Sequence, residues 1–252
     1  MAIFDDVIAL TILGILLDLK DVEPTFANIS QATVFTVLKL IIFLIVIALT
    51  YKLIQKLAQK ENFIENQLNL ILTYLKGKES LFAVFFVFIL IFATITESIG
   101  LHFIIGAFFA SMLISKELVG KKHLETFHNT TNSMAMGFLA PIFFAGIGLE
   151  FQFSSIQNYP LLIAIIAVSF LSKIIGGYIG GRFARLNHKV SLALGIGLNA
   201  RGIMELVIAN IAYKAGIINT EIFSMLVIMG LITTLSTPFL LKRAFKSIEK
   251  IA

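Results

Sequence analysis

The feature that most constrains this chain is a series of long apolar stretches. A helix rising 1.5 Å per residue needs about 20 apolar residues to cross the roughly 30 Å hydrocarbon core of a bilayer. The sequence therefore predicts an all-α membrane protein with about eight transmembrane helices, some of them interrupted. Short polar connections separate the stretches, which are 2–17, 32–54, 80–97, 99–115, 137–151, 160–184, 190–213 and 219–241.

Composition agrees with a chain that lies in lipid. Of its 252 residues, 58% are hydrophobic and only 14% are charged, whereas soluble domains average about 25% charged residues. The chain has no cysteine, which excludes disulfides and thiolate metal sites. Its net charge of +5 is explained by basic membrane-flanking loops, so we expect the lipid bilayer as a partner and no nucleic acid.

Basic residues alternate from one connection to the next. Cytoplasmic loops of membrane proteins are rich in Lys and Arg, so this alternation predicts a multi-pass protein of the cell membrane with both termini of the chain in the cytoplasm. The alternate connections hold only Lys20 and Lys214. Fifteen of the 20 basic residues fall in 52–79, 116–125, 182–189 and 242–250.

Two connections are longer than a turn. Residues 55–78 mix charges with apolar side chains, which indicates an amphipathic linker on the cytoplasmic surface; a plain linker between two bundles explains the pattern equally well. Residues 120–136 are too polar for us to expect them to span the membrane.

Two adjacent carboxylates interrupt the first apolar stretch. Asp5 and Asp6 stand in MAIFDDVIAL. An ionisable residue at membrane depth costs at least a few kcal/mol, and such residues usually mark ion paths. We therefore take both as candidate ion- and proton-binding residues. The alternative is that they cap the positive end of a helix dipole at the membrane surface.

Lys173 lies near the middle of 160–184. It is roughly 20 Å along the helix from the start of that stretch, too deep for its side chain to reach water easily. An ammonium at this depth needs an anionic partner, and Asp5 or Asp6 is the expected one. The alternative is a water-filled cleft that solvates Lys173 without a specific partner.

A polar sequence, GLNARGIMEL, interrupts the seventh stretch. Arg201 and Glu205 are four residues apart, so they share a helix face and can form an ion pair. Asn199 stands between two glycines at the expected break, where we expect its amide to bond free backbone groups. Broken helices of this kind hold the ion sites of many secondary transporters.

Two further motifs have structural explanations. In KIIGGYIGGRF the glycines recur every four residues, which is the spacing that lets two helices approach closely. Glu97 and His102, in TITESIGLH, are expected to be polar residues at helix ends rather than ligands.

Together these stretches resemble the monovalent cation:proton antiporters of the NapA and Kef type. The resemblance covers nearly the whole chain, and the matching segments occur in the order of the family. They are FDDVIAL, GLHFIIGAFFASMLI, FLAPIFFAGIGLEF, SKIIGGYIGG and GLNARGIMELVIANIAYKAGIINTEIFSMLVIMGLITTLSTPFLL.

The resemblance implies a secondary transporter, not an enzyme. The family fold consists of inverted repeats, and an ion-carrying core domain, here including 160–241, slides like an elevator against a dimerisation domain. The second acid, Asp6, matches the carrier of cation and proton, and so the ligand of the transported Na+. The first acid, Asp5, matches the partner of the lysine that is Lys173 here. Homodimerisation and no cofactor beyond the transported ions are implied as well.

Relatives of this type carry about five further helices before the acid pair. We therefore expect the chain to be a transmembrane antiporter domain that is incomplete at its N-terminus, with the missing helices supplied elsewhere. A Kef-like potassium/proton efflux protein and a non-transporting fragment are the alternatives; Kef-type members typically have Asn or Gln at the position of Asp5. An intramembrane aspartyl protease is disfavoured because its two acids lie on different helices, whereas Asp5 and Asp6 are consecutive.

Overall fold

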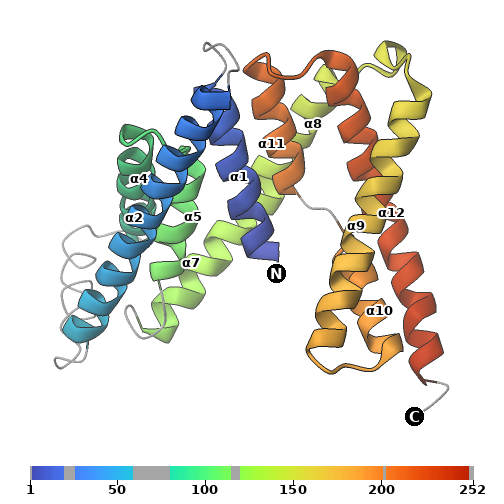
Figure 1. The fold of residues 1–252 in the computed structure, drawn as a ribbon. Helices are drawn as coiled ribbons and strands as arrows, with labels where there is room; N and C mark the ends of the chain where they lie inside the picture. The colour runs from blue at the N-terminus through green and yellow to red at the C-terminus, as the bar shows by residue number, and fades with distance from the viewer. Residues whose placement is uncertain (1, 20–25, 59–79, 115–119, 201–202, 250–252) are drawn as a thin grey trace. The chain divides into compact units, whose positions relative to one another are not determined.

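The computed structural model describes residues 2–19, 26–58, 80–114, 120–200 and 203–249, and every regular element within these ranges is a helix (Figure 1). The all-α prediction is therefore confirmed for the described residues. The elements are α1 (Ala2–Asp18), α2 (Phe26–Ala58), α4 (Ser80–Ser98), α5 (Phe103–Leu113), α7 (Lys121–Met134), η1 (Ala135–Leu139), α8 (Ala140–Glu150), η2 (Phe153–Ser155), α9 (Tyr159–Phe183), α10 (His188–Gly197), α11 (Ile203–Lys214) and α12 (Thr220–Glu249).

Each expected apolar stretch coincides with one or more of these helices. By length and composition, four helical runs within the described residues are able to cross a membrane: Ile29–Leu53, His123–Glu150, Tyr159–Phe183 and Thr220–Lys246. The shorter apolar helices Phe82–Ser98 and Phe103–Leu113 accompany them. The chain is thus an apolar helical protein of the membrane type.

One helix begins earlier than the sequence predicts. The residues from Lys121 to Glu150 form an uninterrupted helical run, made of α7, the π-helical turn η1 and α8. Residues 123–136 form the polar first part of the candidate span His123–Glu150, so the expectation that 120–136 is too polar to span by itself stays a prediction. The π-helical turn ends two residues before Pro141. A wider turn removes part of the demand for the N–H that proline lacks, so the helix continues.

The seventh stretch is broken where the polar sequence occurs. Helix α10 ends at Gly197 and α11 begins at Ile203. Asn187 caps the start of α10 by accepting a hydrogen bond of 3.1 Å from the N–H of Val190. Asn199 lies in the connection after α10, and Arg201 lies outside the described residues.

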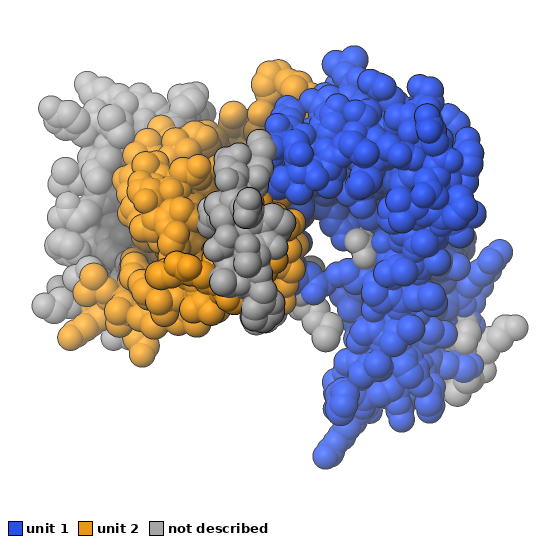
Figure 2. All heavy atoms as spheres, turned by 45° about the horizontal axis from the view of Figure 1, so that its top comes forward, with its two compact units in different colours: residues 1–6, 145–252 blue, residues 7–144 orange. Residues whose placement is uncertain are grey.

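The chain packs as two compact units, coloured separately in Figure 2. Unit 1 comprises residues 1–6 and 145–252, and unit 2 comprises residues 7–144. In unit 1, α9 packs on α10, and α12 packs on α9, α10 and α11. All of the expected core-domain range, 160–241, belongs to unit 1. Of the expected linker, 55–58 form the end of α2, and 59–78 lie outside the described residues.

Unit 2 is built around the antiparallel pair α4 and α5. A Cβ on Gly106 would lie only 2.4 Å from the backbone oxygen of Phe92, so this glycine allows the two helices to touch. At the turn between them, the Glu97 carboxylate accepts a hydrogen bond of 3.0 Å from the N–H of Phe103. His102 Nδ1 accepts one from the N–H of Ile104 at 3.4 Å. Both side chains thus cap the start of α5, as expected for residues at helix ends.

Candidate functional site

The ammonium of Lys173 pairs with the carboxylate of Asp5 within unit 1. Asp5 lies in the first turn of α1, while Lys173 lies near the middle of α9. The two residues are 168 positions apart in the chain. The contact therefore holds the acid doublet opposite the middle of a candidate membrane span, and the lysine has a specific anionic partner.

Asp6 follows on the next position of α1 and is half-buried, whereas Asp5 is more exposed. Consecutive helical residues point about 100° apart. Lys173 therefore pairs with Asp5, while the carboxylate of Asp6 points in a different direction from the helix axis. This geometry gives the two carboxylates different surroundings. One has a fixed counter-ion, and the other is adjacent to that ion pair.

The helix that carries Lys173 packs closely on α10. A Cβ on Gly177 of α9 would lie 2.5 Å from the Cα of Gly195 on α10. One turn further, a Cβ on Gly181 would lie 2.9 Å from the Cβ of Ser191. Because no side chain larger than hydrogen fits at either glycine, α9 and α10 are in backbone contact, as the small-residue spacing predicts.

The polar residues of the broken helix differ in what surrounds them. Asn199 is completely buried, and neither of its side-chain polar atoms has a hydrogen-bond partner among the described residues. The expected bonds from its amide to free backbone groups are therefore not found there. Glu205 is half-buried in the first turn of α11. The predicted pair with Arg201 involves a residue outside the described part of the chain.

The structure also shows a polar cluster that sequence reasoning missed. Glu150, at the end of α8, accepts a hydrogen bond of 2.9 Å from the amide of Asn210 on α11 and lies 3.5 Å from the ammonium of Lys214. Asn210 stands in an otherwise apolar part of α11. A polar residue in that setting indicates that it has a polar partner, but the sequence alone does not identify Glu150 as that partner.

A second missed contact ties α12 to the connection before α9. The Glu221 carboxylate accepts hydrogen bonds of 2.9 Å from the N–H groups of Gln157 and Asn158. Ser224, one turn along α12, accepts one of 3.1 Å from the N–H of Gln152. These bonds fix the entry to α9, the helix that holds Lys173.

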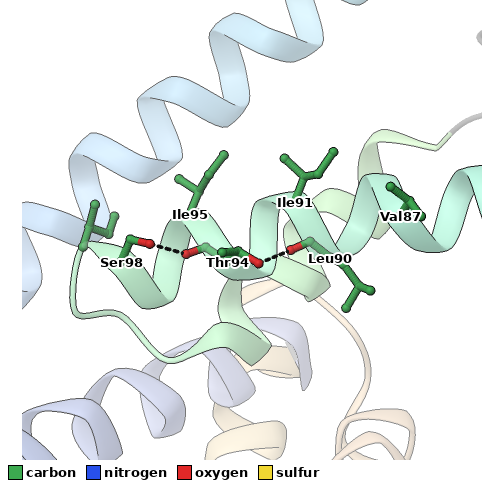
Figure 3. Close-up of a pocket in the computed structure, with 7 residues that line it drawn as sticks. Val87, Leu90, Ile91, Thr94, Ile95 and Ser98 are labelled. Carbon is green, nitrogen blue, oxygen red and sulfur yellow. Dashed lines mark hydrogen bonds between the residues drawn. The ribbon is translucent and has the colours of Figure 1, made fainter.

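A shallow hollow lies along α4, but its lining lacks the charged or free polar groups of an ion site. The side chains labelled in Figure 3 come from this one helix, and the hydroxyl groups of Thr94 and Ser98 donate hydrogen bonds to the backbone carbonyls of Leu90 and Thr94, one turn earlier. The remaining lining residues are apolar and exposed, and they lie on α4 and at the residue that follows it: Val87, Leu90, Ile91, Ile95 and Ile99.

Comparison with known proteins identifies the family. The profile of "Sodium/hydrogen exchanger, transmembrane" matches residues 1–246. A Na(+)/H(+) antiporter of Enterococcus hirae is 36% identical over 155 residues, which are 61% of this chain and 39% of that protein. The Na(+)/H(+)-K(+) antiporter GerN of Bacillus cereus is 31% identical over 180 residues, which are 71% of this chain and 46% of that protein.

A longer match extends over almost the whole chain. The probable Na(+)/H(+) antiporter GerT of Bacillus cereus is 28% identical over 245 residues, which are 97% of this chain and 60% of that protein. The chain thus spans between about two fifths and three fifths of the length of these relatives. Because the family profile covers nearly all of its residues, the chain belongs to the sodium/hydrogen exchanger family of transmembrane proteins.

Proposed function

We propose that the chain exchanges a monovalent cation, Na+, for protons, with Asp6 as the carboxylate that binds them in turn. The observation that carries this proposal is the ion pair between Lys173 and Asp5 beside Asp6. It gives a doublet of acids one fixed counter-ion, so a single negative charge is left for a mobile cation or a proton to neutralise.

Competition for one carboxylate is sufficient for exchange. A hard cation such as Na+ requires oxygen ligands and a deprotonated acid, so cation binding releases a proton and protonation releases the cation. Either ligand neutralises the site. The neutral site crosses the low-dielectric interior at much lower cost than the bare carboxylate, because burying an unpaired charge is expensive.

In this proposal Lys173 sets the charge balance of the site. Without it, Asp5 and Asp6 would be two neighbouring like charges, and each would disfavour ionisation of the other. With it, the ammonium offsets one of the two negative charges, and Asp6 remains available to a cation or a proton. The lysine also places the doublet opposite the middle of α9, away from the ends of that helix.

Sodium is the first candidate because the similar proteins of Enterococcus hirae and Bacillus cereus are described as Na(+)/H(+) antiporters. Potassium is the second, because GerN is described as a Na(+)/H(+)-K(+) antiporter. A non-transporting fragment is the remaining alternative, since the relatives are longer than this chain.

The architecture that goes with this activity is also a proposal. It has both termini of the chain on the cytoplasmic side of the cell membrane, a homodimer, and alternating access by an elevator-like movement of the core helices. It further includes helices equivalent to the upstream part of the longer relatives, supplied by another segment or polypeptide. The basic connections support the orientation.

The test is sodium-driven proton flux in proteoliposomes, measured with a pH-sensitive dye. Wild-type protein is expected to acidify or alkalise the lumen according to the direction of the Na+ gradient, and Asp6→Asn is expected to abolish the flux. Glu125→Gln is the matched control, because it removes a carboxylate whose side chain is 63% exposed on α7. Sodium-driven flux that survives in Asp6→Asn would show that another group carries the ions.

A further inference from the structure

Asn199 is a buried polar side chain that has no hydrogen-bond partner among the described residues. Its exposed fraction is 0%, and neither Oδ1 nor Nδ2 has a hydrogen-bond partner among the described residues. Almost all buried polar groups in proteins are paired, because leaving one unpaired carries its full desolvation cost. Such a residue calls for a partner that reaches it in another state of the protein.

The packing of α9 on α10 indicates which side chain that partner is. The two helices are antiparallel, and their contacts advance by one turn on each: Gly181 meets Ser191, and Gly177 meets Gly195. The next step of four residues leads to Lys173 on α9 and to Asn199, two residues after the end of α10. The chain still follows the helix there, since the N–H of Leu198 bonds the carbonyl of Leu194 at 3.0 Å.

We propose that the amide oxygen of Asn199 is the second acceptor for the Lys173 ammonium, used when a cation occupies the acid doublet. This inference rests on the proposed function. In the described structure the Lys173 ammonium forms an ion pair with the carboxylate of Asp5. A cation bound at Asp5 and Asp6 repels that ammonium, which then needs another oxygen. Asn199 lies opposite Lys173 in the register of α9 against α10, is shielded from solvent, and has both polar atoms available.

An amide suits this role better than a carboxylate. A neutral oxygen stabilises an ammonium through a charge-assisted hydrogen bond, but it offers no full counter-charge. Lys173 is therefore released readily and returns to Asp5 once the cation has left. The side chain thus has two positions of comparable free energy, and occupation of the doublet decides between them. Asn199 acts through Lys173 and is a positioning residue.

The experiment measures the apparent affinity for Na+ by thermal stabilisation of the purified protein, which does not depend on turnover. A ligand that binds only the folded protein raises its melting temperature according to its concentration relative to its dissociation constant. The variants are Asn199→Leu, Lys173→Met and the double variant. Thr36→Val is the control, since Thr36 is another buried side chain whose hydroxyl lacks a partner among the described residues, in unit 2.

We expect Asn199→Leu to raise the half-saturating Na+ concentration about tenfold, the factor expected for a hydrogen bond to a charged group. In the Lys173→Met background the same change is expected to have less than a twofold effect. The melting temperature without Na+ is expected not to fall in Asn199→Leu, because no bond is lost in that state. Thr36→Val is expected to leave the Na+ dependence unchanged.

Equal effects of Asn199→Leu with and without Lys173 would overturn the inference, because the amide would then act independently of the lysine. If Asn199→Leu does not fold, Asn199→Asp serves instead. Its carboxylate is expected to retain the ammonium, so half-saturation moves to lower Na+ only while Lys173 is present. An unchanged half-saturation would overturn the inference. Wild-type protein without any Na+ response would refute the proposed function itself, and the inference with it.

Discussion

The amide of Asn210 donates a hydrogen bond of 2.9 Å to the carboxylate of Glu150, joining α11 to the end of α8. The same carboxylate lies 3.5 Å from the ammonium of Lys214, whose side chain is 65% exposed. Solvent screens such an exposed pair, and pairs of this kind contribute at most about 1 kcal/mol. The hydrogen bond to the half-buried carboxylate is therefore the stronger of the two contacts.

We accordingly predict that Glu150→Ala lowers the free energy of unfolding by about 1–2 kcal/mol, since it leaves the Asn210 amide without its acceptor. Glu150→Gln retains an oxygen acceptor and is expected to lose less. Lys214→Ala is expected to change little. Melting temperatures of the three variants in detergent check this order. An effect of Lys214→Ala as large as that of Glu150→Ala would contradict it.

The glycine contact between α9 and α10 gives a prediction with a matched control one residue away. A Cβ on Gly177 would lie 2.5 Å from the Cα of Gly195, whereas a Cβ on Gly176 meets nothing within 4 Å. Gly177→Ala is expected to force the helices apart and to destabilise the protein by about 1–3 kcal/mol, the usual cost of overpacking. Gly176→Ala is expected to be neutral or stabilising, because alanine favours a helix.

The measurement for this pair is the melting temperature, together with hydrogen exchange of the α10 amides. Faster exchange in α10 is expected for Gly177→Ala alone. Similar melting temperatures for the two alanine variants would mean that the backbone contact does not contribute to stability.

The contact between Glu221 and the connection before α9 predicts a local effect. The carboxylate accepts hydrogen bonds from the N–H groups of Gln157 and Asn158. Glu221→Ala is expected to increase the hydrogen-exchange rate of these two amides, because they lose their acceptor. Glu221→Gln retains an oxygen and is expected to protect them in part. Unchanged exchange in Glu221→Ala would show that other groups hold this connection.

His102 gives unit 2 a pH dependence of defined sign. Burial lowers the pKa of His102 from its ordinary value, although the neighbouring Glu97 acts in the opposite direction. A folded-state pKa below the unfolded one means that the unfolded chain binds the proton more readily. The stability contribution is therefore complete above the ordinary histidine pKa and is lost as the pH falls from there through the lowered pKa of the folded protein.

Protonation of His102 also removes a helix cap, because Nδ1 accepts a hydrogen bond from the N–H of Ile104. A cap contributes about 1 kcal/mol. The melting temperature of the wild type is thus expected to fall between pH 8 and pH 5 by more than that of His102→Asn, which caps without titrating. Parallel pH profiles for the two proteins would count against this role of the histidine.

The apolar pattern was sufficient for the helical class, because residue hydrophobicity and helix length follow from the sequence directly. The pattern failed at α7, where polar side chains at Lys121–Met134 hid a helix that continues into α8. A helix requires only that backbone hydrogen bonds continue, and polar side chains do not interrupt them. The contact of Asn210 with Glu150 could not be predicted either, because it depends on how α8 and α11 pack.

The sequence by itself determined that Asp5, Asp6 and Lys173 are charges in apolar stretches, because hydrophobicity and charge are local properties of the chain. It also determined that the glycines of α9 allow close packing. Only the tertiary structure decided that Lys173 pairs with Asp5 and that Asn199 is completely buried without a described partner. Those facts depend on the register of α9 against α10 and on a contact spanning 168 positions of the chain, which no local pattern encodes.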